Sequence, residues 1–267
     1  MCSFVSVILC LLYHNSGVGA RGLTGRSHRA ILNTYGKGER ELDKEKILAD
    51  LFEMQDIDYR DFQCRLMPTV PREHVIGVRT PLLRAYARSF DREKAEAFMA
   101  ELPHRYYEEN NFHAFLIERL GEWQTTVDAL ERFLPYVDNW ATCDMMRPAV
   151  FADDPSAMRR QARIWMHSPH PYTVRFGIEM LMVHGLEQNF TPDDLDDVAA
   201  VPCEHPYLSR MVAWYFATAL AFRWEETIPY LESDCLDVNT RGRAITKAIE
   251  SHRLTPTQKE YLRTLRS

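Results

Sequence analysis

Glycine is scarce in this chain of 267 residues, where eleven glycines are outnumbered by fourteen prolines and no low-complexity repeat occurs. This composition argues against flexible linkers and favours short, defined corners between helices. No segment shows the alternation of apolar and polar residues that is typical of a half-buried strand, which argues against a β-sheet. Hydrophobic residues make up 46% of the sequence and charged residues 26%, so the chain can bury one sizeable core or two small ones.

Familiar catalytic and metal-binding motifs are also missing. The six cysteines are scattered, without a C-x-x-C pair or a Cys/His pattern at zinc spacing, which fits a reducing compartment best. The sequence contains no G-x-S-x-G elbow, no H-E-x-x-H and no Gly-rich phosphate loop followed by Lys-Ser or Lys-Thr. A formal net charge of −6 repels polyanions, so any nucleic-acid site must be a local basic surface on an acidic body.

The N-terminal segment has two interpretations. An apolar run from Phe4 to Tyr13 is similar to a secretory signal, but it lacks a basic segment before it and is too short to span a bilayer. The alternative is a disordered extension over residues 1–38, which are rich in Gly, Ser, Arg and His. We therefore divide the chain into an extension, residues 1–38, and a helical domain, residues 39–267.

The rest of the chain is predicted to be all-α. From Glu41 onward, apolar residues follow the 3.6-residue period of amphipathic helices, and Pro, Gly, Asn and Asp separate the segments. Helix pairs recur at roughly 35 to 45 positions, the spacing of α-solenoids, which predicts a right-handed α-solenoid. Fourteen helices are expected, over residues 42–55, 58–67, 80–90, 92–102, 109–121, 125–135, 139–146, 155–167, 171–185, 192–200, 206–221, 225–232, 238–251 and 256–265.

Trp214 stands apart from the apolar stripe of its predicted helix, residues 206–221. That stripe consists of Leu208, Met211, Val212, Tyr215, Phe216 and Ala219. At 100° per residue, Trp214 lies roughly 120° from the middle of the stripe. Its indole either packs against a neighbouring helix of the solenoid or forms a stacking platform in a groove.

A second feature is the segment Trp140-Ala-Thr-Cys-Asp144, whose i, i+4 spacing places an indole and a carboxylate on one helical face. A carboxylate beside an aromatic wall can stabilise a developing cation or orient water for attack on one. The simpler interpretation is that Trp140 belongs to the core, while Asp144 caps a helix or pairs with Arg147.

Four basic residues are candidates for DNA contact. Arg175 lies between two apolar stripes of its helix, so its guanidinium either reaches a groove or pairs with Glu179, one turn later. Arg210 precedes Trp214 by one turn, and Arg243 and Lys247 lie one turn apart. Such residues usually form a solvated face, but they are also suited to phosphate contact.

In order and spacing, these features resemble the AlkD-like family of HEAT-repeat DNA alkylation repair glycosylases. The resemblance extends from Glu41 to the end of the chain. It rests on residues 77–84 (GVRTPLLR), residues 137–144 (VDNWATCD), Arg175, Trp214 and residues 243–251 (RAITKAIES).

The resemblance implies a concave DNA-binding cleft, in which the family's W-x-x-x-D pair corresponds to Trp140 and Asp144. Arg175 then corresponds to the cleft arginine and Trp214 to the second cleft tryptophan. Trp140, Asp144 and Trp214 are the implied catalytic residues, and Arg175, Arg210, Arg243 and Lys247 the predicted DNA-binding residues. The tryptophans would contact the deoxyribose while the aspartate supports departure of a cationic purine of the 7-methylguanine or 3-methyladenine type.

The implied enzyme is a DNA N-glycosylase that needs no metal or other cofactor. Its partner would be double-stranded DNA with alkylated bases, and we expect a cytoplasmic, nucleoid-associated monomer without a membrane partner. Active members commonly carry a basic residue three positions after the second tryptophan, where this chain has Ala217. Two alternatives therefore stay open: a non-catalytic protein that binds DNA structures and a protein-binding HEAT scaffold.

Overall fold

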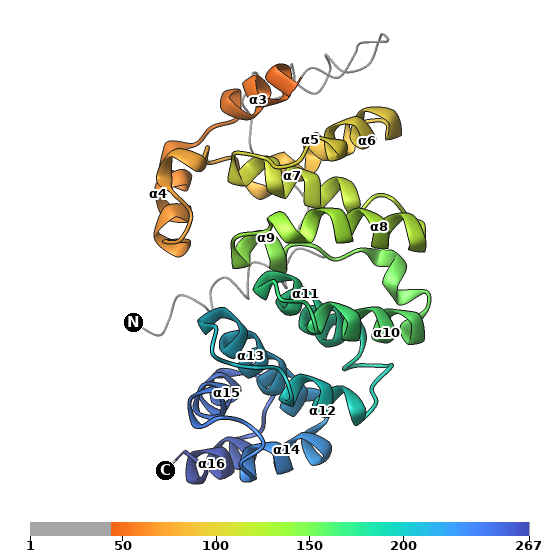
Figure 1. The fold of residues 1–267 in the computed structure, drawn as a ribbon. Coiled ribbons are helices and arrows are strands. Elements are labelled where there is room, and N and C mark those ends of the chain that lie inside the picture. The colour runs from red at the N-terminus through yellow and green to blue at the C-terminus, as the bar shows by residue number, and fades with distance from the viewer. Residues whose placement is uncertain (1–43, 267) are drawn as a thin grey trace. The chain divides into compact units, whose positions relative to one another are not determined.

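The computed structural model describes residues 44–266, which contain fourteen α-helices, three short 3-10 helices and no strand (Figure 1). The fold is an all-α helical repeat solenoid, as predicted, whereas its handedness and a concave cleft remain predictions. The α-helices are α3 (Lys44–Glu53), α4 (Ile57–Leu66), α5 (Thr80–Arg88), α6 (Arg92–Ala100), α7 (Tyr107–Ile117), α8 (Trp123–Phe133), α9 (Trp140–Asp144), α10 (Pro155–Met166), α11 (Pro171–His184), α12 (Asp193–Ala199), α13 (Pro206–Phe222), α14 (Trp224–Glu232), α15 (Val238–Glu250) and α16 (Pro256–Thr264).

The N-terminal predictions concern residues that the structure does not describe. The apolar run from Phe4 to Tyr13 and the extension over residues 1–38 lie outside the described residues. The described residues belong to a compact unit that spans Glu41–Ser267. No helix among them is both long and apolar enough to cross a membrane.

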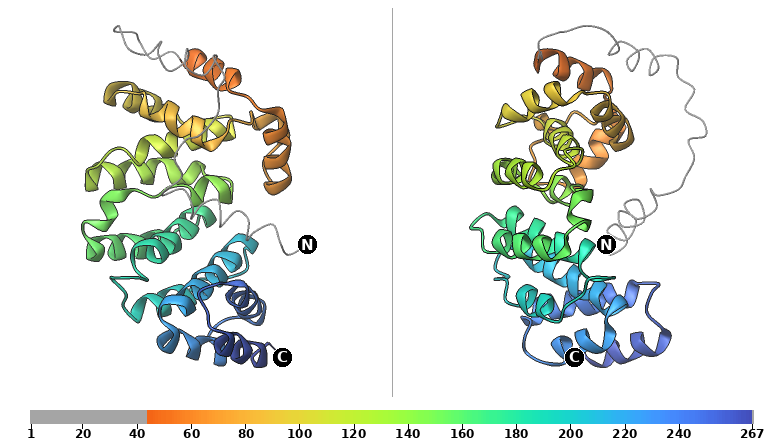
Figure 2. Two further views of the ribbon diagram at one scale, coloured as in Figure 1. Left: turned by 180° about the vertical axis from the view of Figure 1, so that it is seen from behind. Right: turned by 90° about the vertical axis from the view of Figure 1, so that its right-hand side faces the viewer.

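The helices from α5 onward form two rows. In the odd-numbered row, α5 packs on α7, α7 on α9, α9 on α11, α11 on α13, and α13 on α15. Each even-numbered helix packs against a member of that row, and α6, α8, α10 and α12 lie along one side in Figure 1. Neighbours in sequence stay neighbours in space from α3 to α16 in both further views (Figure 2). Each pair of helices therefore buries its apolar faces only with the help of the next pair.

The odd-numbered row forms the buried layer of the solenoid. All eleven residues of α7 are buried, and so are Tyr172 to Met182 of α11. In α11, Gly177 permits close packing on α10, because a Cβ atom there would lie 2.8 Å from the carbonyl oxygen of Ala162. The two apolar stripes predicted for this helix reflect that position between two neighbours.

The repeat is shorter than the sequence pattern suggested. Side-chain hydrogen bonds between successive odd-numbered helices join residues 31 to 34 positions apart, below the predicted spacing of 35 to 45. The corners are tight because proline occupies the first turn of α5, α10, α11, α13 and α16. Proline fits this position since its fixed φ suits a helix start and its missing N–H has no partner there.

Candidate DNA-contacting and catalytic site

The short helix α9 carries both members of the predicted Trp-Asp pair. Asn139 caps it by accepting a hydrogen bond from the backbone N–H of Thr142 at 2.8 Å. The Thr142 hydroxyl in turn donates to Asn111 Oδ1 of α7 at 2.8 Å. A helix of five residues has little stability of its own, so these buried contacts hold it in place.

Asp144 and Arg175 form a buried, two-pronged ion pair. Arg175 donates from Nε to Asp144 Oδ1 and from Nη2 to Oδ2, each at 2.6 Å. The residues are only 2% and 5% exposed. Arg175 also donates from Nη1 to the carbonyl oxygen of Tyr207 at 2.9 Å, so this one side chain joins α9, α11 and the first turn of α13. Such bidentate pairing fixes the orientation of the carboxylate.

The partners of both charges differ from those that sequence spacing suggested. Arg175 pairs with Asp144 and not with Glu179, one turn away in its own helix. Arg147 contacts Glu179 at 3.3 Å and not Asp144, and the cap of α9 is Asn139. The guanidinium of Arg175 is therefore engaged inside the protein, whereas the prediction placed it in the DNA cleft. Spacing along one helix did not predict these partners, because the i, i+4 rule considers one isolated helix and ignores contacts between helices.

Glu179 is the least expected member of this group. It is fully buried, and its Oε2 atom has no hydrogen-bond partner. Burial raises the pKa of its carboxyl well above the ordinary value, and the negative charge of Asp144 raises this pKa further. Burial and the neighbouring carboxylate therefore both favour the protonated form of Glu179. The sequence feature that could have indicated this buried carboxyl is a charged residue within a helix that is apolar on both sides.

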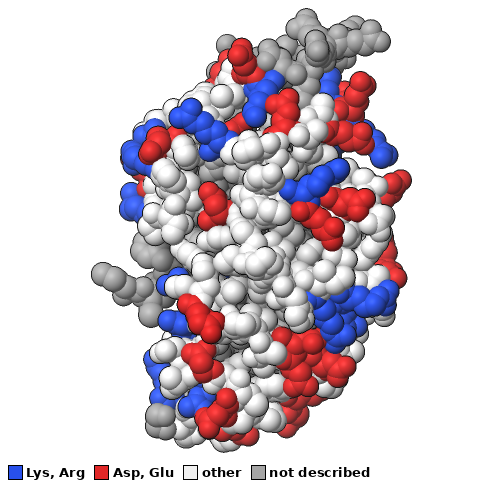
Figure 3. All heavy atoms as spheres, in the orientation of Figure 1, with Lys and Arg blue, Asp and Glu red and all other residues white. Residues whose placement is uncertain are grey.

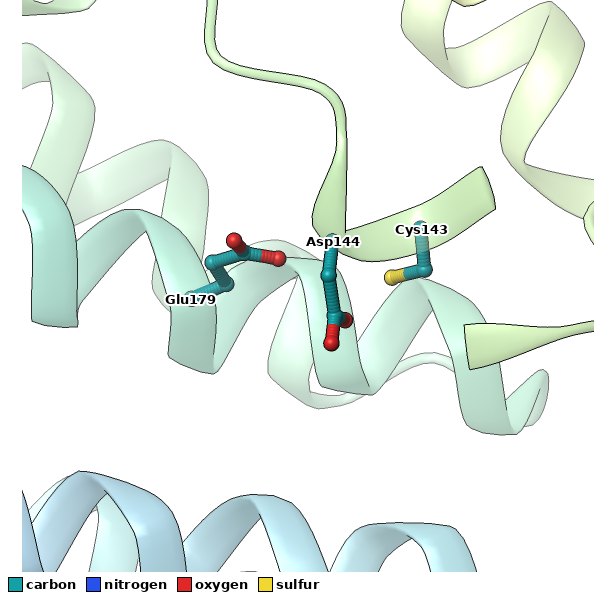
Figure 4. A group of neighbouring side chains, drawn as sticks. All are labelled: Cys143, Asp144 and Glu179. Carbon is teal, nitrogen blue, oxygen red and sulfur yellow. The ribbon is translucent and has the colours of Figure 1, made fainter. Parts of the chain in front are cut away.

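Cys143, Asp144 and Glu179 offer ligand atoms within 4.8 Å of one another (Figure 4). Cys143 and Asp144 come from α9 and Glu179 from α11. A metal ion would compete with Arg175 for both oxygens of Asp144. Burial also raises the pKa of the Cys143 thiol well above its usual value, so a metal would have to displace a tightly held proton. The donor set therefore fits a guanidinium better than a metal.

Trp140 lies at the first position of α9 and is half-buried. Its indole Nε1 donates to the carbonyl oxygen of Leu66, at the end of α4, at 3.4 Å. Asp144 follows one turn later on the same helix. The structure thus keeps the aromatic ring and the carboxylate on one short, anchored element.

Trp214 is buried in α13, with 9% of its surface exposed. The ammonium group of Lys247, on α15, lies 5.8 Å from the centre of the Trp214 ring, within cation–π range. The pKa of Lys247 is lowered, chiefly by burial; the charge of Glu250 opposes this shift, and the charge of Arg175 adds to it. The structure therefore places a cation over the ring of Trp214.

The other two predicted DNA contacts are exposed on the same two helices. The guanidinium of Arg210 lies 5.3 Å from the ring centre of Tyr207, and Arg243 Nη1 donates to Ser209 Oγ at 2.5 Å. Neither forms a salt bridge with a carboxylate among the described residues. Both remain available for anions. On the face drawn in Figure 3, acidic and basic side chains are interspersed, so basic charge is local there, as the acidic composition requires.

Two glutamates hold neighbouring loops in place: Glu108 in α7 and Glu118, the residue that follows the last turn of α7. Glu108 accepts backbone N–H groups of Ile76 and Gly77 at 2.8 and 2.7 Å. Gly77 has a φ of +98°, and a Cβ atom there would lie 2.5 Å from a backbone oxygen, which explains the glycine in the GVRTPLLR segment. Glu118 accepts from Arg84 at 2.5 Å and from the backbone N–H of Arg147 at 2.8 Å, which holds the loop after α9. Sequence periodicity did not single out either glutamate.

These observations define a class of protein: a repeat solenoid with a buried carboxylate–guanidinium pair beside aromatic side chains. A model of the family described as DNA alkylation repair enzyme matches residues 47–201, more than half of the chain. The chain belongs to this family, and the resemblance stated from its sequence is confirmed. The matched segment includes Trp140, Asp144 and Arg175 and ends before Trp214. No curated protein and no solved structure matches the chain.

Proposed function

We propose that this DNA alkylation repair enzyme is a DNA glycosylase that removes positively charged alkylated purines by hydrolysis of the N-glycosidic bond. The 7-methylguanine and 3-methyladenine types are the expected lesions. The observation that carries the proposal is the geometry of Asp144, a buried carboxylate held at both oxygens by Arg175. The proposal also rests on membership of a DNA alkylation repair family.

The chemistry suits a charged carboxylate. An alkylated purine that already carries a positive charge is a good leaving group, so the barrier lies mainly in the positive charge that develops on the deoxyribose. A fixed negative charge in a water-poor site stabilises this oxocarbenium-like state without reorganising during the reaction. Asp144 would supply that charge and orient the attacking water, while Trp140 and Trp214 contact the sugar.

Basic side chains around the pair would hold the DNA. Arg210 and Arg243 are exposed near the first turns of α13 and α15, and Lys247 covers Trp214. These cations would contact phosphates, which predicts a salt-dependent affinity for duplex DNA. Active relatives commonly have a basic residue at the position of Ala217. The test therefore also considers the alternative function, DNA binding without excision.

The test is single-turnover release of 7-methylguanine from duplex DNA by the wild type and by Asp144→Asn. We expect the excision rate to fall by about 10² or more, the scale of losing one preorganised transition-state contact. Asp194→Asn is the matched control, because Asp194 is also a buried carboxylate held by an arginine, Arg159, at 2.6 and 3.1 Å. That variant should be destabilised similarly and should still excise at close to the wild-type rate below its melting temperature.

The outcomes separate the candidate functions. Excision by Asp144→Asn at the wild-type rate would show that the carboxylate is structural and that the assigned chemistry is wrong. A wild type that binds duplex DNA in a salt-dependent way without excising would favour the non-catalytic DNA-binding protein. A wild type without affinity for DNA would favour the protein-binding scaffold.

A further inference from the structure

Lys247 is an unusual residue in this chain. The sequence contains only six lysines among its 32 basic residues, and Lys247 is the only lysine between Lys94 and Lys259. It lies in α15, half-buried, with its ammonium group 5.8 Å from the centre of the Trp214 ring. An arginine would serve equally well on an aromatic face and better against a phosphate, so a lysine here requires another reason.

Burial favours the neutral amine of Lys247, and the nearby charges act in opposite directions. It forms no salt bridge with a carboxylate among the described residues; Glu250, exposed and one turn later in α15, is the acidic group that counteracts its pKa shift. Burial is the main cause that lowers the pKa of Lys247, and the positive charge of Arg175 lowers it further. Partial burial next to another cation is the environment that turns a lysine into a nucleophile toward carbonyl groups.

We propose that Lys247 is the nucleophile of an abasic-site lyase activity, in which its amine attacks C1′ of the deoxyribose left after base removal. The inference rests on the proposed function in one respect: the deoxyribose must be held against Trp214. If it is, the amine of Lys247, which lies 5.8 Å from the centre of the Trp214 ring, lies beside the sugar.

The reaction balances without an oxidant, a reductant or a metal. The ring-opened abasic sugar carries an aldehyde at C1′, to which Lys247 Nζ adds; loss of one water gives an imine. A proton then leaves C2′ and the C3′–O bond breaks, so that the phosphate departs with the electron pair and the strand is cut on the 3′ side. Water hydrolyses the remaining unsaturated imine and returns the lysine.

The test is covalent trapping on a duplex that already contains one abasic site, with sodium borohydride present to reduce the imine. DNA is used at a concentration that saturates every variant, so a change in affinity does not affect the result. We expect a covalent protein–DNA adduct with the wild type and at least a tenfold loss with Lys247→Arg, which keeps the charge but cannot form this imine. Lys259→Arg, the same replacement at a lysine of α16, is the control and should trap like the wild type.

A second measurement covers the case in which Lys247→Arg fails to fold. Proteolysis of the wild-type adduct should place the DNA on the peptide that contains Lys247. The absence of an adduct with the wild type, undiminished trapping by folded Lys247→Arg, or attachment at another residue would each overturn the inference. Because the duplex already lacks the base, these results do not depend on excision, so this inference and the glycosylase proposal can fail separately.

Discussion

The buried charges around Asp144 should behave as one coupled unit, and a double-mutant cycle tests this directly. The cycle compares Asp144→Asn, Glu179→Gln and the double variant with the wild type. In the folded protein Asp144 pairs with Arg175, and burial together with the charge of Asp144 favours the protonated form of Glu179. Removal of the Asp144 charge takes away one cause of the raised pKa of Glu179, so that Glu179 can ionise and balance the arginines instead.

The expected magnitudes follow from the contacts. Loss of one partner of a buried ion pair costs about 3–5 kcal/mol when nothing replaces the lost charge. In Asp144→Asn the ionised Glu179 should reduce this to about 2–3 kcal/mol, which is within the roughly 1.5–3 kcal/mol of one hydrogen bond to a charged group. Glu179→Gln alone should cost about 1 kcal/mol or less, because the amide resembles the protonated acid and its oxygen can still accept the hydrogen bond from Arg147.

The double variant has no carboxylate left to balance Arg147 and Arg175. Its destabilisation should exceed the sum of the single effects by about 1–3 kcal/mol, within the range measured for residues in one charge network. Urea unfolding at pH 7, with equal denaturant dependence checked across the four proteins, supplies the free energies. Additive effects within about 0.5 kcal/mol would refute the reasoning, since that is the behaviour of independent sites.

Two further predictions concern single positions. The stability of the wild type relative to Glu179→Gln should fall as the pH rises above 4.5 toward the raised pKa of folded Glu179. The reason is that folded Glu179 holds a proton that the unfolded chain releases. A difference in melting temperature between the two proteins that stays constant from pH 4.5 to 8 would contradict the direction of this pKa shift. Gly177→Ala should destabilise the protein by about 1–3 kcal/mol through its close approach to Ala162 and Met166. The control is Gly242→Ala, because a Cβ atom at Gly242 has no neighbour within 4 Å. This substitution should stabilise α15 by up to about 1 kcal/mol. Equal effects of the two substitutions on urea unfolding would refute the packing argument.

The helices themselves were readily predicted from the sequence. Each of the fourteen predicted segments overlaps an observed helix, because the 3.6-residue apolar period and the proline at helix starts are local signals. The spacing of the repeats was less accurate, since it depends on how tightly the corners close. The corner between α9 and α10, for example, contains only a short 3-10 helix, and no local pattern fixes the length of such a connection.

The sequence predicted the shared helix of Trp140 and Asp144 but not the contacts of the candidate site residues. Trp140 and Asp144 share α9 as expected, but the sequence assigned Arg175 to a groove or to Glu179. The structure buries Trp214 almost completely, and only the three-dimensional arrangement places Lys247 over its ring. Burial of a charge depends on what the neighbouring repeat supplies, and the amphipathic pattern of one helix does not contain that information.

In a solenoid, residues one repeat apart in the sequence are neighbours in space, just as residues i and i+4 are neighbours in a single helix. Equivalent positions of successive odd-numbered helices face each other, so complementary residues one repeat apart are natural partners. Asp144 and Arg175 are 31 positions apart, Arg147 and Glu179 are 32 apart, and Ser209 and Thr240 are 31 apart. The same interval holds in the even-numbered row with small variation, where Arg163 and Asp197 are 34 positions apart. Because the interval varies only between 31 and 34 positions, one such contact limits the partner of a buried charge in another repeat to a few positions of the sequence. A buried charge that has no counterpart among those positions is then a candidate for a functional role.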